Sequence, residues 1–185
     1  MKRVFIAVKI DPGGELLRIM SSLKALLGAE KIKWVDPLNI HLTLAFLGDT
    51  EELRIKAVAD MLKERCIGFN EFGFVLAGTG VFKNFRDLRV IWVGIQSTER
   101  LSLLYGIIKE GLKLNGFEVE EREFKPHLTI GRIKLIRDTE NLKTVLERYK
   151  DFEFQTVHVA EVILFESILQ QTGAIYKPLG TYNLS

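Results

Sequence analysis

The sequence has little cysteine, no long apolar run and almost no net charge, and each of these shortages excludes a class of protein. Its 185 residues include one cysteine, Cys66, so neither an internal disulfide nor a cysteine cluster for a metal can form. A reducing cytoplasm therefore fits best, and Cys66 is expected to be a small buried apolar residue. The apolar residues, 47% of the total, occur in strand-length runs well short of a membrane span. We therefore expect a soluble, cytoplasmic globular protein without membrane contact.

The charges of the chain are nearly balanced. Lysine and arginine total 26 against 24 acidic residues, a formal charge of +2. This is too little for broad electrostatic capture of a long nucleic acid, so any anionic partner must be held locally. Three local basic groups occur: Lys31 with Lys33; Lys83 with Arg86 and Arg89; and Lys125 with Arg132, Lys134 and Arg137. Each group is equally compatible with a solvated face.

Hydrophobic periodicity predicts mixed helices and strands along the whole chain. Helical spacing covers residues 15–27, 51–65, 98–114 and 138–149. Strand patterns cover residues 4–8, 39–47, 71–77, 88–95, 127–133, 152–165 and 174–182. The order strand, helix, His-x-Thr strand, helix, strand occurs in residues 3–80 and again in residues 88–165, and a last strand returns after residue 174. We therefore expect one bilobal domain over residues 1–185, with any ligand in the cleft between the lobes.

The same tetrapeptide occurs once in each predicted lobe. His41-Leu-Thr-Leu and His127-Leu-Thr-Ile lie 86 residues apart and differ by one conservative exchange. Side chains alternate on a strand, so each His and its following Thr share one face while the apolar residues enter the core. Two imidazoles and two hydroxyls are therefore predicted to face one another across the cleft.

This set of groups suits in-line displacement at phosphorus. One histidine can take a proton from the attacking oxygen while the other donates a proton to the leaving oxygen, because their ordinary pKa lies near neutral pH. The hydroxyls of Thr43 and Thr129 can hold the non-bridging phosphate oxygens. No metal and no cofactor is needed, and residue patterns alone do not say which histidine is the acid.

These residues resemble the 2H phosphoesterases, and within them the RNA 2′,3′-cyclic phosphodiesterases, also called 2′-5′ RNA ligases. The resemblance rests on Lys33-Trp-Val leading through Asn39 to His41-Leu-Thr-Leu-Ala-Phe-Leu-Gly48, and on Phe124-Lys-Pro-His-Leu-Thr-Ile-Gly-Arg132. Lesser landmarks are Arg89-Val-Ile-Trp92-Val, Leu164-Phe-Glu-Ser167, Gly173 and Tyr176. Together they cover nearly the whole chain.

The resemblance implies an α+β fold of two pseudo-symmetric lobes, each an antiparallel sheet with helices on its outer side. It implies hydrolysis of a terminal 2′,3′-cyclic phosphate to a 2′-phosphate, with His41 as proton donor and His127 as proton acceptor. The reverse reaction would join RNA ends by a 2′-5′ bond without ATP. The implied partner is an RNA or nucleotide with a cyclic phosphate end. We expect the protein to be a monomer.

Arg132 is a further phosphate-binding candidate, although strict alternation places it on the face opposite to His127. A β-bulge at Gly131 would turn it into the cleft. The same parity assigns Phe46 to the core. Phe124, Phe82 or Phe85 could stack on the terminal base, and the sequence does not choose among them.

Two other functions are compatible with the fold. A non-catalytic nucleotide- or RNA-binding domain is disfavoured because both histidines are intact. A metal-dependent hydrolase would use His41, His127 and His158, but no carboxylate or histidine spacing completes such a site. His158 lacks a threonine two residues later, so a structural or surface role is expected for it.

Overall fold

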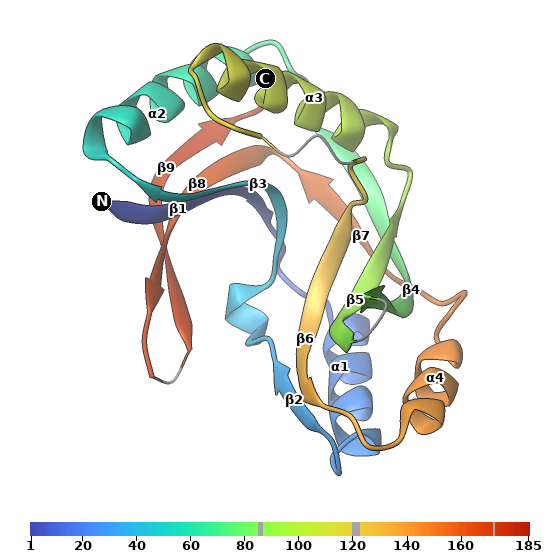
Figure 1. The fold of residues 1–185 in the computed structure, drawn as a ribbon. Helices are drawn as coiled ribbons and strands as arrows, with labels where there is room; N and C mark the ends of the chain where they lie inside the picture. Colours follow the sequence, from blue (N-terminus) through green and yellow to red (C-terminus); the bar gives the residue numbers. More distant parts are fainter. Residues whose placement is uncertain (85–86, 120–122, 172) are drawn as a thin grey trace.

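Two antiparallel β-sheets form the centre of the protein. The computed structural model describes residues 1–84, 87–119, 123–171 and 173–185. Sheet A has the strand order β3-β1-β8-β9, from β3 (His41–Thr50), β1 (Lys2–Lys9), β8 (Glu161–Leu169) and β9 (Ala174–Asn183). Sheet B has the order β2-β6-β5-β4-β7, from β2 (Lys31–Trp34), β6 (His127–Leu135), β5 (Asp87–Gln96), β4 (Phe72–Asn84) and β7 (Glu153–Val159). Figure 1 shows the two sheets facing each other across the middle of the molecule.

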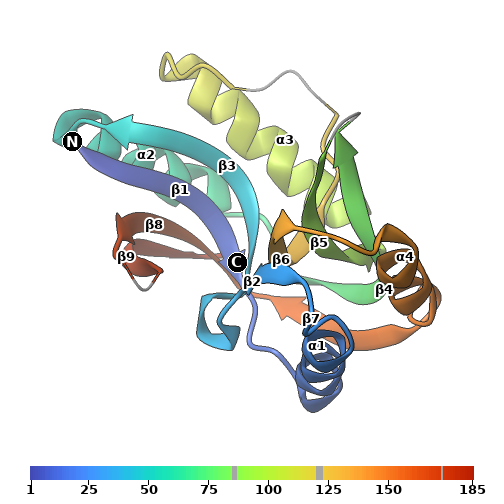
Figure 2. The same cartoon turned by 60° about the horizontal axis from the view of Figure 1, so that its bottom comes forward.

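The helices cover the outer sides of the sheets in pairs. α2 (Glu52–Cys66) and α3 (Glu99–Leu114) pack on each other and over sheet A, whereas α1 (Gly14–Leu26) and α4 (Thr139–Glu147) pack on sheet B. Figure 2 shows these two pairs at opposite ends of the molecule. A short 3₁₀ turn, Pro37–Asn39, leads into β3, and the Asp36 side chain caps it by accepting a hydrogen bond from the Leu38 N–H. The predicted α+β architecture, with helices outside two antiparallel sheets, is confirmed.

Burial of one face explains why each element forms. In α2 the buried residues follow helical spacing, namely Ile55, Val58, Met61, Leu62 and Cys66. Cys66 is 1% exposed, which confirms its predicted role as a buried apolar residue. The strands contribute alternate residues to the same core. In the part of the chain that the structure describes, no helix is long and apolar enough to cross a membrane.

The segment predicted as one strand over residues 152–165 is two strands in different sheets. The chain leaves sheet B at the end of β7 and enters sheet A as β8, with Ala160 between them. The Ala160 carbonyl accepts a hydrogen bond from the Leu184 N–H, which ties this crossing to the C-terminal end. The prediction of one strand was therefore wrong. It could not locate the crossing because no glycine or proline marks it in the sequence. β2 was not predicted at all.

Each sheet takes strands from both halves of the chain. β4 comes from the first half but lies in sheet B between β5 and β7, and β8 comes from the second half but lies in sheet A beside β1 (Figure 1). One helix also packs on the sheet of the other lobe, because α1 follows β1 of sheet A but packs on sheet B. The two lobes are therefore interlocked. β3 and β6, which carry the two His-x-Thr motifs, belong to different sheets and contact each other.

Candidate active site

The two His-x-Thr motifs show the predicted alternation. Leu42, Leu44, Leu128 and Ile130 are 0–4% exposed and belong to the core. His41, Thr43, His127 and Thr129 are at least partly exposed on the other face of their strands. Each motif therefore presents an imidazole and a hydroxyl side by side, away from the core.

Both imidazole rings are held by the same backbone hydrogen bond. His41 Nδ1 lies 2.7 Å from the carbonyl oxygen of Asn39, and His127 Nδ1 lies 2.8 Å from the carbonyl oxygen of Lys125. A carbonyl oxygen only accepts, so Nδ1 must carry a proton in each ring. Nε2 is then the nitrogen left to exchange a proton, and it can act as a base when unprotonated or as an acid when protonated.

Aromatic rings support both imidazoles. The His41 ring contacts Phe5 and the edge of Tyr176, with centroid distances of 5.0 and 4.9 Å. Phe5 also stacks on Phe165 within a small apolar cluster on this face of sheet A. The His127 ring meets Phe82 edge-on at 4.6 Å. The orientation of each imidazole is thus fixed by one hydrogen bond and by packing.

The surroundings of His41 shift its pKa. Burial lowers the pKa of His41, because desolvation disfavours the imidazolium, and the positive charge of Arg132 lowers it further. The hydrogen bond to the Asn39 carbonyl acts in the opposite direction. Arg132 belongs to the second motif, so its effect on His41 is an electrostatic contact across the cleft.

A β-bulge turns Arg132 toward the cleft. In the pairing of β5 with β6, Ile91 lies opposite Gly131 but Trp92 lies opposite Thr129, so Ile130 is an extra residue. Ile130 and Gly131 are consecutive buried positions. Arg132 is therefore exposed on the same face as His127 and Thr129. The bulge expected at Gly131 is therefore present, centred one residue earlier.

The first motif contains an equivalent bulge, and this corrects the interpretation of Phe46. In the pairing of β1 with β3, Ile6 lies opposite Ala45 but Ala7 lies opposite Thr43, so Leu44 is the extra residue. The prediction that Phe46 is a core residue was wrong, because its side chain is 56% exposed. Phe46 and Arg132 each follow the motif histidine by five residues. This shared offset was the signal that strict alternation obscured.

Two hollows lie along the cleft, one on each side of Phe46, which lines both. The first, here called the aromatic pocket, has a volume of about 460 Å³ and is lined by Thr43 of the first motif and His127 of the second. The second, here called the basic groove, has a volume of about 640 Å³ and is lined by Asn39, Arg132 and Tyr176 among others. The aromatic pocket is thus lined by residues of both motifs. The basic groove adjoins His41, because Asn39 and Tyr176, which contact His41, line it.

The remaining predicted residues lie in several places. His158 is at the surface, where its Nε2 lies 2.6 Å from a carboxylate oxygen of Glu71. Phe82 and Phe124 both line the aromatic pocket. Phe85 and the side chains of Lys83, Arg86 and Arg89 lie outside the described residues. Within the described ranges, no group of three or more His, Cys, Asp or Glu residues could hold a metal ion.

Sequence reasoning missed Tyr105 and Arg3. Tyr105 stacks on Phe124 with a centroid distance of 4.0 Å and lines the aromatic pocket from α3. Helical periodicity alone gave it no functional signal. Arg3 lines the basic groove and lies over the Phe46 ring, 5.2 Å from its centroid.

Comparison with known families gives a match over most of the chain. The model of the LigT-like phosphoesterase family matches twice in tandem, to residues 8–92 and 93–176. Each match contains one His-x-Thr motif. The two matches of the family model therefore agree with the internal repeat predicted from the sequence pattern.

Individual relatives agree with this match. An RNA 2′,3′-cyclic phosphodiesterase of Methanothermobacter thermautotrophicus is 33% identical over 184 residues, which covers 98% of both chains. One from Thermotoga maritima is 38% identical over 181 residues and covers 96% of this chain and 92% of its own. A crystal structure of the protein TT0787 from Thermus thermophilus has a TM-score of 0.78 and 25% identity, with 98% of this chain and 97% of that chain covered. The apo form of LigT from E. coli has a TM-score of 0.75 and 24% identity, with 100% and 98% covered.

Proposed function

Because the chain belongs to the LigT-like phosphoesterase family, we propose that it is an RNA 2′,3′-cyclic phosphodiesterase that uses His41 and His127 as its acid–base pair. Its substrate is an RNA end that carries a 2′,3′-cyclic phosphate, and its product is a 2′-phosphate. One observation carries the mechanism. Both rings keep Nδ1 bound to a backbone carbonyl, and this leaves two Nε2 atoms for proton transfer at one cleft.

In the proposed reaction, His127 Nε2 accepts a proton from water as the water oxygen bonds to phosphorus. The bond from phosphorus to O3′ breaks, and His41 Nε2 donates the proton that the leaving oxygen needs. Thr43, Thr129 and the Arg132 guanidinium hold the non-bridging oxygens, where negative charge persists throughout the displacement. The strained five-membered ring needs no further activation, so no cofactor takes part.

In the free protein the surroundings of His41 disfavour the protonated ring that a general acid needs. Burial and Arg132 both lower the pKa of His41 in the free protein. A phosphate anion in the cleft offsets the charge of Arg132 and favours the imidazolium. The substrate thereby promotes protonation of its own general acid.

The experiment is hydrolysis of an oligoribonucleotide that ends in a 2′,3′-cyclic phosphate, with the product identified by phosphorus NMR. We expect a 2′-phosphate from the native protein. His41→Ala and His127→Ala should each lower kcat by at least about 10²- to 10⁴-fold, the contribution typical of one general acid or base. His158→Ala is the matched control, because that imidazole is paired with Glu71 on the surface.

A single motif variant with full activity would refute the two-histidine mechanism, and an inactive native protein would favour a binding function instead. Retained activity in EDTA tests independence from metals. We also propose that the enzyme acts as a monomer, because one chain supplies both histidines. A cytoplasmic location is supported by the lone thiol of Cys66.

A further inference from the structure

The two hollows beside Phe46 differ in their balance of rings and charges. Four aromatic rings line the aromatic pocket, those of Phe46, Phe82, Tyr105 and Phe124. Its charged lining residues are Lys109, Lys125 and Glu123, and Lys125 is paired with Glu123. Tyr105 and Phe124 are stacked with an interplanar angle of 5°. Such a surface suits a flat nucleobase, because every base can stack on an aromatic face.

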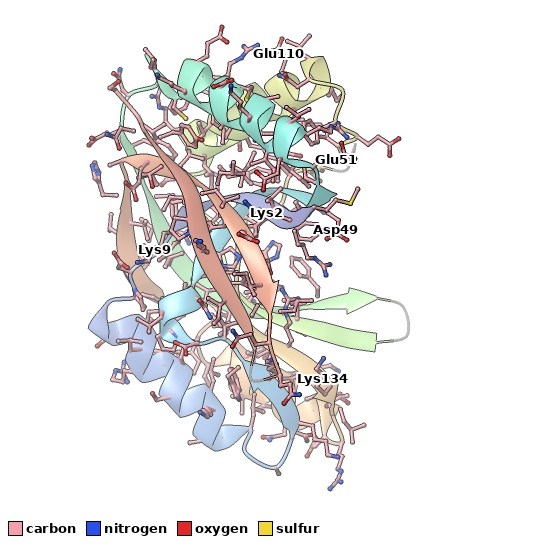
Figure 3. All side chains as sticks on the ribbon, turned by 90° about the vertical axis from the view of Figure 1, so that its left-hand side faces the viewer. Lys2, Lys9, Asp49, Glu51, Glu110 and Lys134 are labelled. Atoms are coloured by element: carbon pink, nitrogen blue, oxygen red, sulfur yellow. The ribbon has the colours of Figure 1, made fainter. Side chains whose placement is uncertain are left out.

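The basic groove carries an excess of positive charge. Its lining includes four cationic side chains, Arg3, Lys33, Arg132 and Lys134, and a single carboxylate, Asp36. Asp36 already accepts the Leu38 N–H that caps the 3₁₀ turn. Lys134 is on β6, and Figure 3 labels it in the lower half of the molecule.

The cations of the groove are not neutralised by the protein. Within the described part of the chain, none of Lys33, Arg132 and Lys134 has a carboxylate partner at ion-pair distance. The Lys33 ammonium lies near Gly173 at the turn of the β8–β9 hairpin, 3.8 Å from where a β-carbon would stand. Lys33 therefore extends across the groove from sheet B to the hairpin of sheet A. Unpaired cations in this groove suit a chain of phosphates.

Each hollow adjoins a different histidine. His127 lines the aromatic pocket directly. His41 contacts Tyr176 and binds the Asn39 carbonyl, and both of these residues line the basic groove. A substrate that fills both hollows therefore has a fixed direction relative to the acid–base pair.

We propose that the terminal base enters the aromatic pocket and that the RNA strand leaves through the basic groove, with its last phosphodiesters on Lys33 and Lys134. This inference rests on the proposed function and adds to it the path of the strand. The favoured substrate is an RNA end of two or more nucleotides, rather than a cyclic mononucleotide, which has no phosphate to place in the groove.

The same direction accounts for the identity of the product. In ribose, O2′ is on C2′, which is bonded to C1′, the carbon that carries the base. O3′ is on C3′, which is bonded to C4′, the carbon through which the strand continues toward its 5′ end. A base beside His127 and a strand beside His41 place O3′ on the His41 side. His41 then protonates O3′ as its bond to phosphorus breaks, while His127 takes the proton of the water that attacks phosphorus in line, on the side opposite O3′. The phosphate remains on O2′.

The test compares two substrates, 2′,3′-cyclic AMP and a five-nucleotide RNA that ends in a 2′,3′-cyclic phosphate. In the double variant Lys33→Ala/Lys134→Ala, kcat/KM for the five-nucleotide RNA should fall on the order of tenfold at low salt, mainly through KM. The values for cyclic AMP should stay unchanged. The salt dependence of kcat/KM for the RNA should weaken by about 0.7 in logarithmic slope for each lysine removed. Lys56→Ala/Lys63→Ala on the exposed side of α2 is the matched control.

The possible results separate the strand path from the proposed function. Equal losses with both substrates, or no loss with either, would overturn the path, even if the histidine variants still abolish hydrolysis. A 3′-phosphate product would overturn both the direction of the strand and the 2′-phosphate product of the proposed function. Absence of hydrolysis of both substrates by the native protein would instead reject the proposed function and the path with it.

Discussion

Gly80→Ala should displace the Trp92 ring, which packs behind the candidate active site, and thereby lower both stability and activity. Gly80 pairs across the sheet with Trp92, and Trp92 pairs in turn with Thr129, so the three residues form one row on the cleft side of sheet B. A β-carbon at residue 80 would lie 2.2 Å from Cζ2 and 2.5 Å from Cη2 of the Trp92 ring. Ordinary van der Waals contact begins near 3.4 Å. The indole must therefore move by roughly 1 Å or more.

The displacement has a short route to the His127 ring. Trp92 packs on Phe82 at 5.7 Å between centroids, and Phe82 packs on His127 at 4.6 Å. Overpacking of this kind costs about 1–3 kcal/mol of folding free energy, and a 1 Å misplacement in an active site can cost about 10²-fold in rate. We expect Gly80→Ala to lower Tm by roughly 2–4 °C for each kcal/mol lost. It should also lower kcat/KM by about 10- to 100-fold.

The assay combines thermal unfolding followed by circular dichroism with hydrolysis of a cyclic-phosphate RNA well below Tm. Gly106→Ala in α3 is the control, because a β-carbon there has no atom within 4 Å. It should raise stability by about 1 kcal/mol and leave activity unchanged. Gly80→Ala with native Tm would refute the clash, and full activity despite a lowered Tm would refute its transmission to His127.

Three further results are expected. In the free protein the pKa of His41 should lie below its ordinary value of 6.5 and should rise in Arg132→Gln, as followed by NMR titration; a wild-type value above 6.5, or no rise, would contradict the electrostatic contact. Burial raises the pKa of Cys66 to about 11, so native protein should resist iodoacetamide at pH 8 and react only after unfolding; rapid native labelling would disprove this. Phe46→Ala should raise KM roughly 5- to 150-fold with little change in Tm, since the removed ring is 56% exposed; an unchanged KM would exclude stacking on this ring.

Local sequence patterns predicted those parts of the site that depend on one strand at a time. Alternation placed each His and Thr together because the period of two is a property of any extended chain. The core positions Leu42 and Leu128 followed from the same period, and both are 0–1% exposed. The internal repeat then assigned one motif to each sheet.

The bulges were harder to predict because they depend on the pairing partner. Whether Leu44 is an extra residue is decided by β1, and whether Ile130 is extra is decided by β5. A glycine at residue 131 gave a hint in the second motif. The first motif has alanine at the equivalent position, so only the five-residue offset that Phe46 shares with Arg132 indicated that Phe46 faces the cleft.

The change of sheet after β7 is another non-local feature. Residues 152–165 keep a strand-like composition throughout, and only tertiary packing ends one strand at Val159 and begins the next at Glu161. The opposite walls of the basic groove come from β2, β6 and the β8–β9 hairpin, which are far apart in sequence. Its charge was visible only as separate basic residues.

The carbonyl that anchors each imidazole also determines how the enzyme recovers between turnovers. Under the proposed mechanism, hydrolysis leaves His41 neutral and His127 protonated, the reverse of the starting condition. Neither the Asn39 nor the Lys125 carbonyl can supply or remove a proton, so both rings must recover through Nε2. Water that enters the emptied cleft can then exchange protons with those atoms. Until it does, the pair holds the protonation needed to close the ring again, so departure of the product decides whether the reaction stays in the direction of hydrolysis.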